Sequence, residues 1–102
     1  MFESINPKVA AEAAAKRLQQ KVGMMGAIMG PLSIANGVRG SAEYETTLGL
    51  VDAAQIALRL GETTKARELI DRSVEEMWNC VKLLPKTPRK LVAANLKKIA
   101  KY

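Results

Sequence analysis

The amino-acid sequence predicts an all-α fold of about four helices, with a long N-terminal helix, a central antiparallel helical hairpin and a basic C-terminal helix. Apolar residues recur at spacings of three and four along most of the chain, and no alternating run is long enough to indicate a strand. Proline, glycine and cap-forming residues divide this pattern into four stretches. The chain has 102 residues, 48% of them hydrophobic, which suffices for one domain with a small aliphatic core. We therefore expect residues 1–102 to form a single helical domain.

The first predicted helix occupies most of the segment 1–30. Asn6 precedes Pro7, and asparagine is a good N-cap while proline is favoured at the first helical position. The dipeptide Gly30-Pro31 is expected to end the helix. Residues 31–40, with the sequence PLSIANGVRG, are then a connection to the next helix.

Two faces of this first helix differ in character. The apolar face consists of Leu18, Val22, Met25 and Met29, at steps of four, three and four. A second face carries Gly23, Gly26 and Gly30 and therefore has no side chains. Because glycine in a helix interior costs about 1 kcal/mol relative to alanine, three glycines on one line predict the close approach of another backbone. That backbone belongs either to the second helix of the same chain or to a second copy.

The segment 41–84 is predicted to form the central hairpin. Ser41 is a suitable N-cap for the second helix, and Gly61 is expected to end that helix. The third helix begins with a threonine cap at position 63 or 64 and continues to Leu84, because Pro85 stops it. The second helix is apolar on nearly all sides, so we expect it to be the central helix or to carry a subunit interface.

These two helices resemble a tetratricopeptide-type helical hairpin over Leu48–Val81, joined by the turn LRLGETTKARELI. The resemblance implies that Ala66 and Ile70 take the small and large packing positions of the second helix of the hairpin. The early aromatic residue and the closing proline of that pattern are absent, and the chain has one copy where stacked repeats normally need several. The resemblance therefore concerns helix packing and implies no peptide-binding function.

The charged residues are divided into blocks along the chain. Residues 1–40 carry five basic and two acidic groups, residues 41–79 carry four and eight, and residues 80–102 carry seven and none. The net charge of +6 is thus concentrated in the last block, which includes a fourth predicted helix from Thr87-Pro88 within the segment 85–102. The basic residues of this block are Lys82, Lys86, Arg89, Lys90, Lys97, Lys98 and Lys101.

These seven basic side chains are the candidate binding site. We expect them to contact the phosphate backbone of DNA or RNA without sequence specificity, because the block has one arginine and no cluster of Asn and Gln to contact base edges. Three alternatives remain open. The lysines could form a solvated face, an amphipathic helix on an anionic membrane, or a docking surface for the acidic middle of a second copy.

A homo-oligomer is expected to form through the glycine and methionine face together with the second helix. The candidate interface residues are Gly23, Met25, Gly26, Met29, Gly30, Leu48 and Val51. The expected function is that of a non-enzymatic assembly protein, of the structural or packaging type found in virions and nucleoids. The main alternative is a membrane-active or membrane-peripheral protein that inserts the Gly/Met segment 22–38, and a soluble adaptor for a protein partner is the third interpretation.

Enzymatic chemistry is not predicted. Histidine, the commonest general base and metal ligand, is absent, and the chain has neither a glycine-rich phosphate-binding motif nor a CxxC pair. We expect no catalytic residue, no metal site, no cofactor and no small-molecule substrate. Cys80 is expected to be a small apolar filler on the third helix. A single cysteine and the lack of a recognisable secretory signal favour a reducing intracellular compartment or the interior of a virion.

Overall fold

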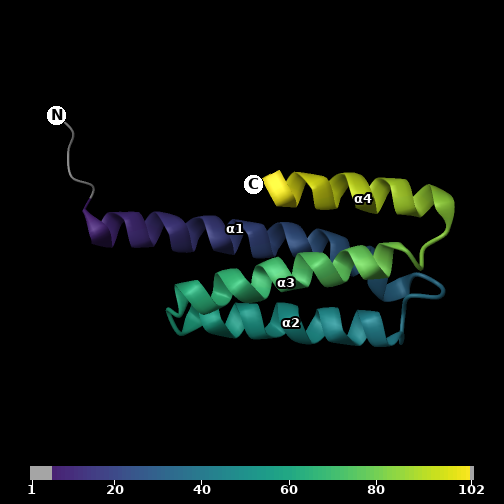
Figure 1. Ribbon diagram of the computed structural model, residues 1–102, viewed down its shortest axis with the longest axis horizontal. Helices are drawn as coiled ribbons and strands as arrows, with labels where there is room; N and C mark the ends of the chain where they lie inside the picture. The colour runs from purple at the N-terminus through teal and green to yellow at the C-terminus, as the bar shows by residue number, and fades with distance from the viewer. Residues whose placement is uncertain (1–5, 102) are drawn as a thin grey trace.

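The computed structural model describes residues 6–101, which form four α-helices (Figure 1). The helices are α1 (Pro7–Ile34), α2 (Ala42–Arg59), α3 (Thr63–Val81) and α4 (Lys86–Lys101). No strand occurs within residues 6–101, so the prediction of an all-α fold with about four helices is confirmed. Residues 1–5 and Tyr102, the outer ends of the predicted segments 1–30 and 85–102, lie outside the described part of the chain.

Successive helices run in opposite directions and form a flat bundle (Figure 1). In the described part of the chain, α1 and α3 contact each other and both remaining helices, whereas α2 and α4 share no contact. Consequently, α2 and α4 form opposite edges of the molecule, with α1 and α3 between them (Figure 1). The Cα atoms span only 16 Å along the shortest axis.

The core is aliphatic and lies where the two middle helices meet the edge helices. Its large, fully buried side chains include Met25, Ile28 and Leu32 from α1, Ile70 and Met77 from α3, and Leu96 and Ile99 from α4. The inner face of α2 contributes small side chains, and Ala54 and Thr47 are both fully buried. Small side chains permit close helix approach, and α2 and α3 share the most extensive contact in the bundle.

The α1 helix continues past its predicted end at Gly30-Pro31 and reaches Ile34. Proline removes the N–H that would bond to the carbonyl of Ala27. Both Pro31 and Ala27 are exposed, so water can reach that carbonyl. Leu32 is fully buried, and this burial favours continuing the helix for one more turn. The connection therefore occupies residues 35–41 rather than 31–40.

The first turns of α1 extend beyond the rest of the bundle (Figure 1). Asn6 caps the helix as predicted, because its side-chain oxygen accepts from the backbone N–H of Lys8 at 2.9 Å. Every residue from 6 to 13 is exposed, and Leu18 is the first buried residue. This part of α1 is accordingly held by helix propensity and capping rather than by packing.

The predicted ends of the hairpin helices are confirmed in part. Ser41 caps α2 by accepting from the N–H of Tyr44 at 3.1 Å, and Gly61 ends it in the left-handed conformation, with φ of +76°. The threonine cap predicted for α3 is wrong, since Glu62 holds that position without a side-chain bond. α3 ends at Val81 rather than Leu84, because the chain turns at residues 82–84 before Pro85.

The two residues to which the resemblance assigns packing positions are both in the core. Ala66 and Ile70 are both fully buried.

The fourth helix begins earlier than predicted, at Lys86 rather than at a Thr87 cap. Pro88 falls within the first turn of α4, where its missing N–H would have had no helical partner, so the helix can begin ahead of it.

Candidate nucleic-acid interface

The α4 helix is held against the bundle along one face. Val92, Leu96 and Ile99 are its buried residues, and α4 packs against both α1 and α3. The basic C-terminal segment is thus a docked helix with a fixed outer face.

Four lysines lie on the outer face of α4, at spacings of four, seven and four residues. They are Lys86, Lys90, Lys97 and Lys101, and we call them the lysine ridge. At 3.6 residues per turn, these positions fall within about 60° of one another around the helix axis. With a rise of 1.5 Å per residue, the ridge extends over about 22 Å. All four side chains are exposed, and they lie opposite the buried face.

The other three predicted residues lie outside the ridge. Lys98 is exposed on the flank of α4, and Lys82 is exposed in the turn after α3. Arg89 has a structural contact, because its Nε and Nη2 atoms both donate to the carbonyl of Leu84, at 3.2 and 2.8 Å. The structure therefore places four of the seven predicted residues on one line and the other three outside it.

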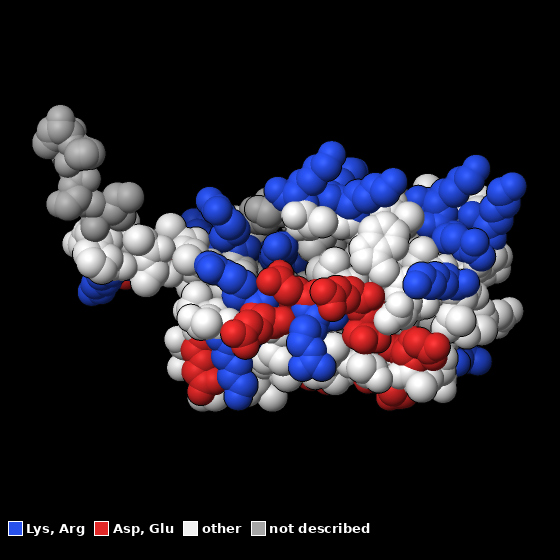
Figure 2. Space-filling view, viewed as in Figure 1, with Lys and Arg blue, Asp and Glu red and all other residues white. Residues whose placement is uncertain are grey.

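Within residues 6–101, no ion pair neutralises the lysines of the ridge. No acidic residue follows Glu76 in the sequence. Within residues 6–101 the structure records one ion pair, between Lys65 and Glu62 at 3.9 Å, at the start of α3. Figure 2 shows basic side chains gathered over α4 along one edge and acidic side chains in a band over α3. The charge blocks of the sequence thus become two separate surfaces.

The predicted oligomer interface is divided by the fold. Met25, Met29 and Val51 are buried in the core of their own chain, which removes them from any surface offered to a second copy. Leu48 is 36% exposed on α2. The remaining predicted residues are the three helical glycines.

The glycine face of α1 is open to solvent. A Cβ atom built at Gly23, Gly26 or Gly30 would meet nothing within 4 Å. The expectation that these glycines let the second helix approach closely is therefore wrong. Val22, which precedes Gly23 on α1, is half-buried and faces α2 across the gap between the two helices.

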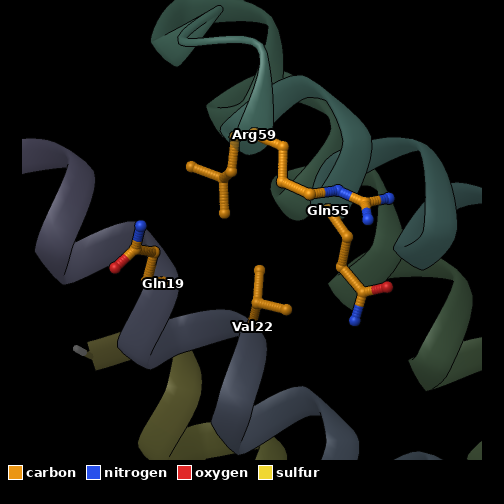
Figure 3. Close-up of a pocket in the computed structure, with 5 residues that line it drawn as sticks. Gln19, Val22, Gln55 and Arg59 are labelled. Atoms are coloured by element: carbon orange, nitrogen blue, oxygen red, sulfur yellow. The ribbon is translucent and has the colours of Figure 1, made fainter.

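A shallow groove of about 320 Å³ lies between α1 and α2. It is lined by Gln19, Val22, Gln55, Leu58 and Arg59. In Figure 3, Val22 points from α1 into the gap, while the polar ends of Gln55 and Arg59 lie at its rim on α2. The lining offers hydrogen-bond donors over an aliphatic floor and contains no nucleophile or carboxylate.

Cys80 occupies the core as the sequence predicts and is a free thiol. Burial raises the pKa of the Cys80 thiol, and the charges of Glu43 and Glu76 act in the same direction. The hydrogen bond with Thr47 lowers that pKa but has the smaller effect. Between residues 6 and 101, no group of three or more His, Cys, Asp or Glu side chains is placed to hold a metal ion.

The Gly/Met segment 22–38 contributes to the core. Met25, Ile28, Leu32 and Val38 are all nearly or fully buried, so inserting this segment into a bilayer requires the bundle to open. Among the described helices, none combines the length and the apolar character that a membrane crossing requires.

No family model, no curated protein and no solved structure matches this chain.

Proposed function

We propose that the protein is a non-enzymatic helical assembly protein that binds the phosphate backbone of nucleic acid through α4 and self-associates, in a packaging role of the virion or nucleoid type. The observation that carries the proposal is the lysine ridge. It presents four exposed cations on one side of a docked helix over about 22 Å.

The geometry of the ridge suits a polyanion. A DNA duplex carries one phosphate charge per roughly 1.7 Å of its axis, so a ridge of this length faces several phosphates at once. Lysine contacts phosphate as a point charge and reads no base edge. The proposed binding is therefore independent of sequence and strongly dependent on salt.

A salt titration with duplex DNA tests this proposal. Replacing Lys90, Lys97 and Lys101 with Gln removes three ridge charges, and the slope of log affinity against log salt should fall by about 2.7 units. The matched control replaces Lys65, Arg67 and Arg72 on α3 with Gln, which removes the same charge from the acidic surface. The slope of the control should remain that of the unmodified protein.

Three results would contradict the proposal. They are an absence of DNA binding, an equal loss in the ridge variant and its control, and preferential binding to one DNA sequence. Flotation with anionic liposomes in the absence of DNA binding would instead favour the membrane-peripheral alternative.

A further inference from the structure

One side of α2, continued by its C-cap residue Leu60, carries an uncharged stripe that the rest of the described chain leaves largely exposed. Its residues are Ala42, Thr46, Gly49, Ala53, Ile56 and Leu60, and we call them the α2 seam. None of them is buried, and the two largest, Ile56 and Leu60, are 48% and 67% exposed. A Cβ atom at Gly49 would meet nothing within 4 Å. The helix that carries the seam forms one edge of the molecule (Figure 1).

The spacing of the seam is that of a helix-pairing surface. Its residues follow one another at steps of four, three, four, three and four, which is the repeat along which one helix packs on another over several turns. Next to its C-terminal half lies a groove of about 250 Å³, lined by Ile56, Leu60 and Leu69 among others. Glu62 and Lys65, which form an ion pair, also line this groove, so the apolar surface consists of the stripe together with Leu69.

The sizes of the seam residues select an antiparallel second copy. Small side chains occupy the N-terminal half of the seam, and the large ones occupy its C-terminal end. When a second α2 lies antiparallel with a two-fold axis near residue 51, large residues face small ones. The facing pairs are Ala42 with Leu60, Thr46 with Ile56, and Gly49 with Ala53. A parallel copy would place Leu60 on Leu60 and leave the small residues facing a gap.

The charges beside the seam favour the same arrangement. Glu45, Asp52 and Arg59 are exposed, seven residues apart, along the flank of the seam nearer α1. The structure shows no ion pair for Glu45 or Arg59 within residues 6–101. An antiparallel copy brings Glu45 beside Arg59 of the second copy, and symmetry repeats that pair. The two Asp52 side chains then lie near the axis at the solvent surface, where their repulsion is screened.

We propose that the protein forms a two-fold dimer in which α2 packs antiparallel on α2 of a second copy through the α2 seam. This inference rests on the self-association part of the proposed function and is independent of phosphate binding. It replaces the interface predicted from Met25, Met29 and Val51 with residues that are accessible in the fold. Because α2 and α4 lie at opposite edges, the dimer carries its two lysine ridges away from the α2 interface, so it can bridge two segments of polyanion.

Sedimentation equilibrium of the full chain tests the interface. A single helix stripe is at the small end of specific interfaces, so we expect a dimer dissociation constant on the order of micromolar. Gly49→Gln places a bulky side chain where the two helices must approach and should weaken the dimer by more than tenfold. The substitution should not harm folding, because Gln is a better helix former than Gly and the site is open.

Gly26→Gln is the matched control, since Gly26 is also helical, exposed and open. It should dimerise like the unmodified protein. A monomeric unmodified protein at every concentration would overturn the proposal, and so would a dimer that withstands Gly49→Gln. Loss of the dimer in Gly26→Gln alone would also overturn it, because the interface would then be the glycine face of α1.

A charge swap tests the antiparallel orientation. Glu45→Arg and Arg59→Glu should each weaken the dimer, because each places like charges side by side. The double variant restores both pairs and should dimerise like the unmodified protein, whereas failure of this restoration contradicts the antiparallel arrangement.

DNA titration of Gly49→Gln separates the two proposals. If Gly49→Gln is monomeric and its DNA binding keeps the salt slope of the unmodified protein, the phosphate-binding proposal is unaffected. If the unmodified protein dimerises but binds no DNA, only the phosphate-binding proposal is contradicted.

Discussion

The hydroxyl of Thr47 on α2 lies 3.6 Å from the thiol sulfur of Cys80 on α3, and both side chains are fully buried. The same hydroxyl donates to the carbonyl of Glu43, one turn earlier on α2, at 2.7 Å. The polar atom of Thr47 is thereby satisfied inside the core. This contact joins the two hairpin helices and gives the Cys80 thiol a polar partner inside the core.

We predict that Cys80 is inert in the native protein. Burial raises the pKa of its thiol above the ordinary value of 9.0, and the thiolate is the reactive form. A disulfide-exchange reagent near neutral pH should label Cys80 only as fast as the bundle opens, and rapidly once denaturant unfolds the chain. Fast labelling of the native protein would show that the thiol is accessible.

The same pKa shift predicts a loss of stability in alkali. The unfolded chain ionises its thiol at lower pH than the folded chain, so stability from this group is complete below about pH 9 and is lost as pH rises through the folded pKa. The advantage in unfolding free energy of the unmodified protein over Cys80→Ser should shrink as pH rises above about 9 toward the raised pKa of the folded thiol. A constant difference between the two proteins across this range would contradict the prediction.

Alanine at the open glycines of α1 should stabilise the fold. A Cβ atom at Gly23 or Gly26 would meet no atom within 4 Å, and both residues have helical backbone. Each alanine substitution should therefore raise the unfolding free energy by about 1 kcal/mol. In thermal unfolding this corresponds to a rise in Tm of roughly 4–8 °C. Gly61→Ala should instead destabilise by about 1–2 kcal/mol, because Gly61 adopts a φ of +76°. Destabilisation by Gly26→Ala would mean that another surface packs against this face.

Leu96→Ala should release α4 from the bundle. Leu96 is fully buried, and truncation of such a side chain typically costs about 2–5 kcal/mol. Leu91 on the same helix is 68% exposed, so Leu91→Ala is the matched control and should change stability little. Chemical denaturation followed by circular dichroism measures both, and equal effects of the two substitutions would contradict the docked position of α4.

Arg89→Lys should separate structural from electrostatic roles on α4. Two donors of Arg89 converge on the carbonyl of Leu84, a geometry that the single ammonium of lysine cannot reproduce. We expect a loss of about 1 kcal/mol in unfolding free energy. DNA affinity should remain unchanged, because the charge is retained. A loss of DNA affinity would instead identify Arg89 as a phosphate contact that needs the guanidinium geometry.

Much of the local structure could be predicted from neighbouring residues alone. Asn6, Ser41 and Gly61 start or end helices where expected, because caps and left-handed turns depend on the residue itself and its immediate neighbours. The predicted end of α1 at Gly30-Pro31 is wrong because it ignores packing against residues distant in sequence. Pro31 marks a local stop, and the burial of Leu32 in the bundle outweighs it.

Surface assignments were less predictable. The sequence shows that Met25, Met29 and Val51 are apolar, but apolar side chains serve a core and an interface equally well. The exposed stripe on α2 has a visible signal, the three–four spacing from Ala42 to Leu60, yet α2 is apolar on nearly all sides. The sequence does not indicate which faces of α2 are covered by α1 and α3 in the folded protein.

By itself, the sequence determined the helical class, the caps of α1 and α2, and the separation of basic from acidic blocks. These depend on propensities and on the order of charges along the chain. Three further features follow from how the helices pack: the glycine face of α1 is open, Lys86 joins the ridge, and α2 and α4 lie on opposite edges. The physical reason is that burial depends on contacts between residues far apart in the chain, and several ways of packing four amphipathic helices satisfy the same local pattern.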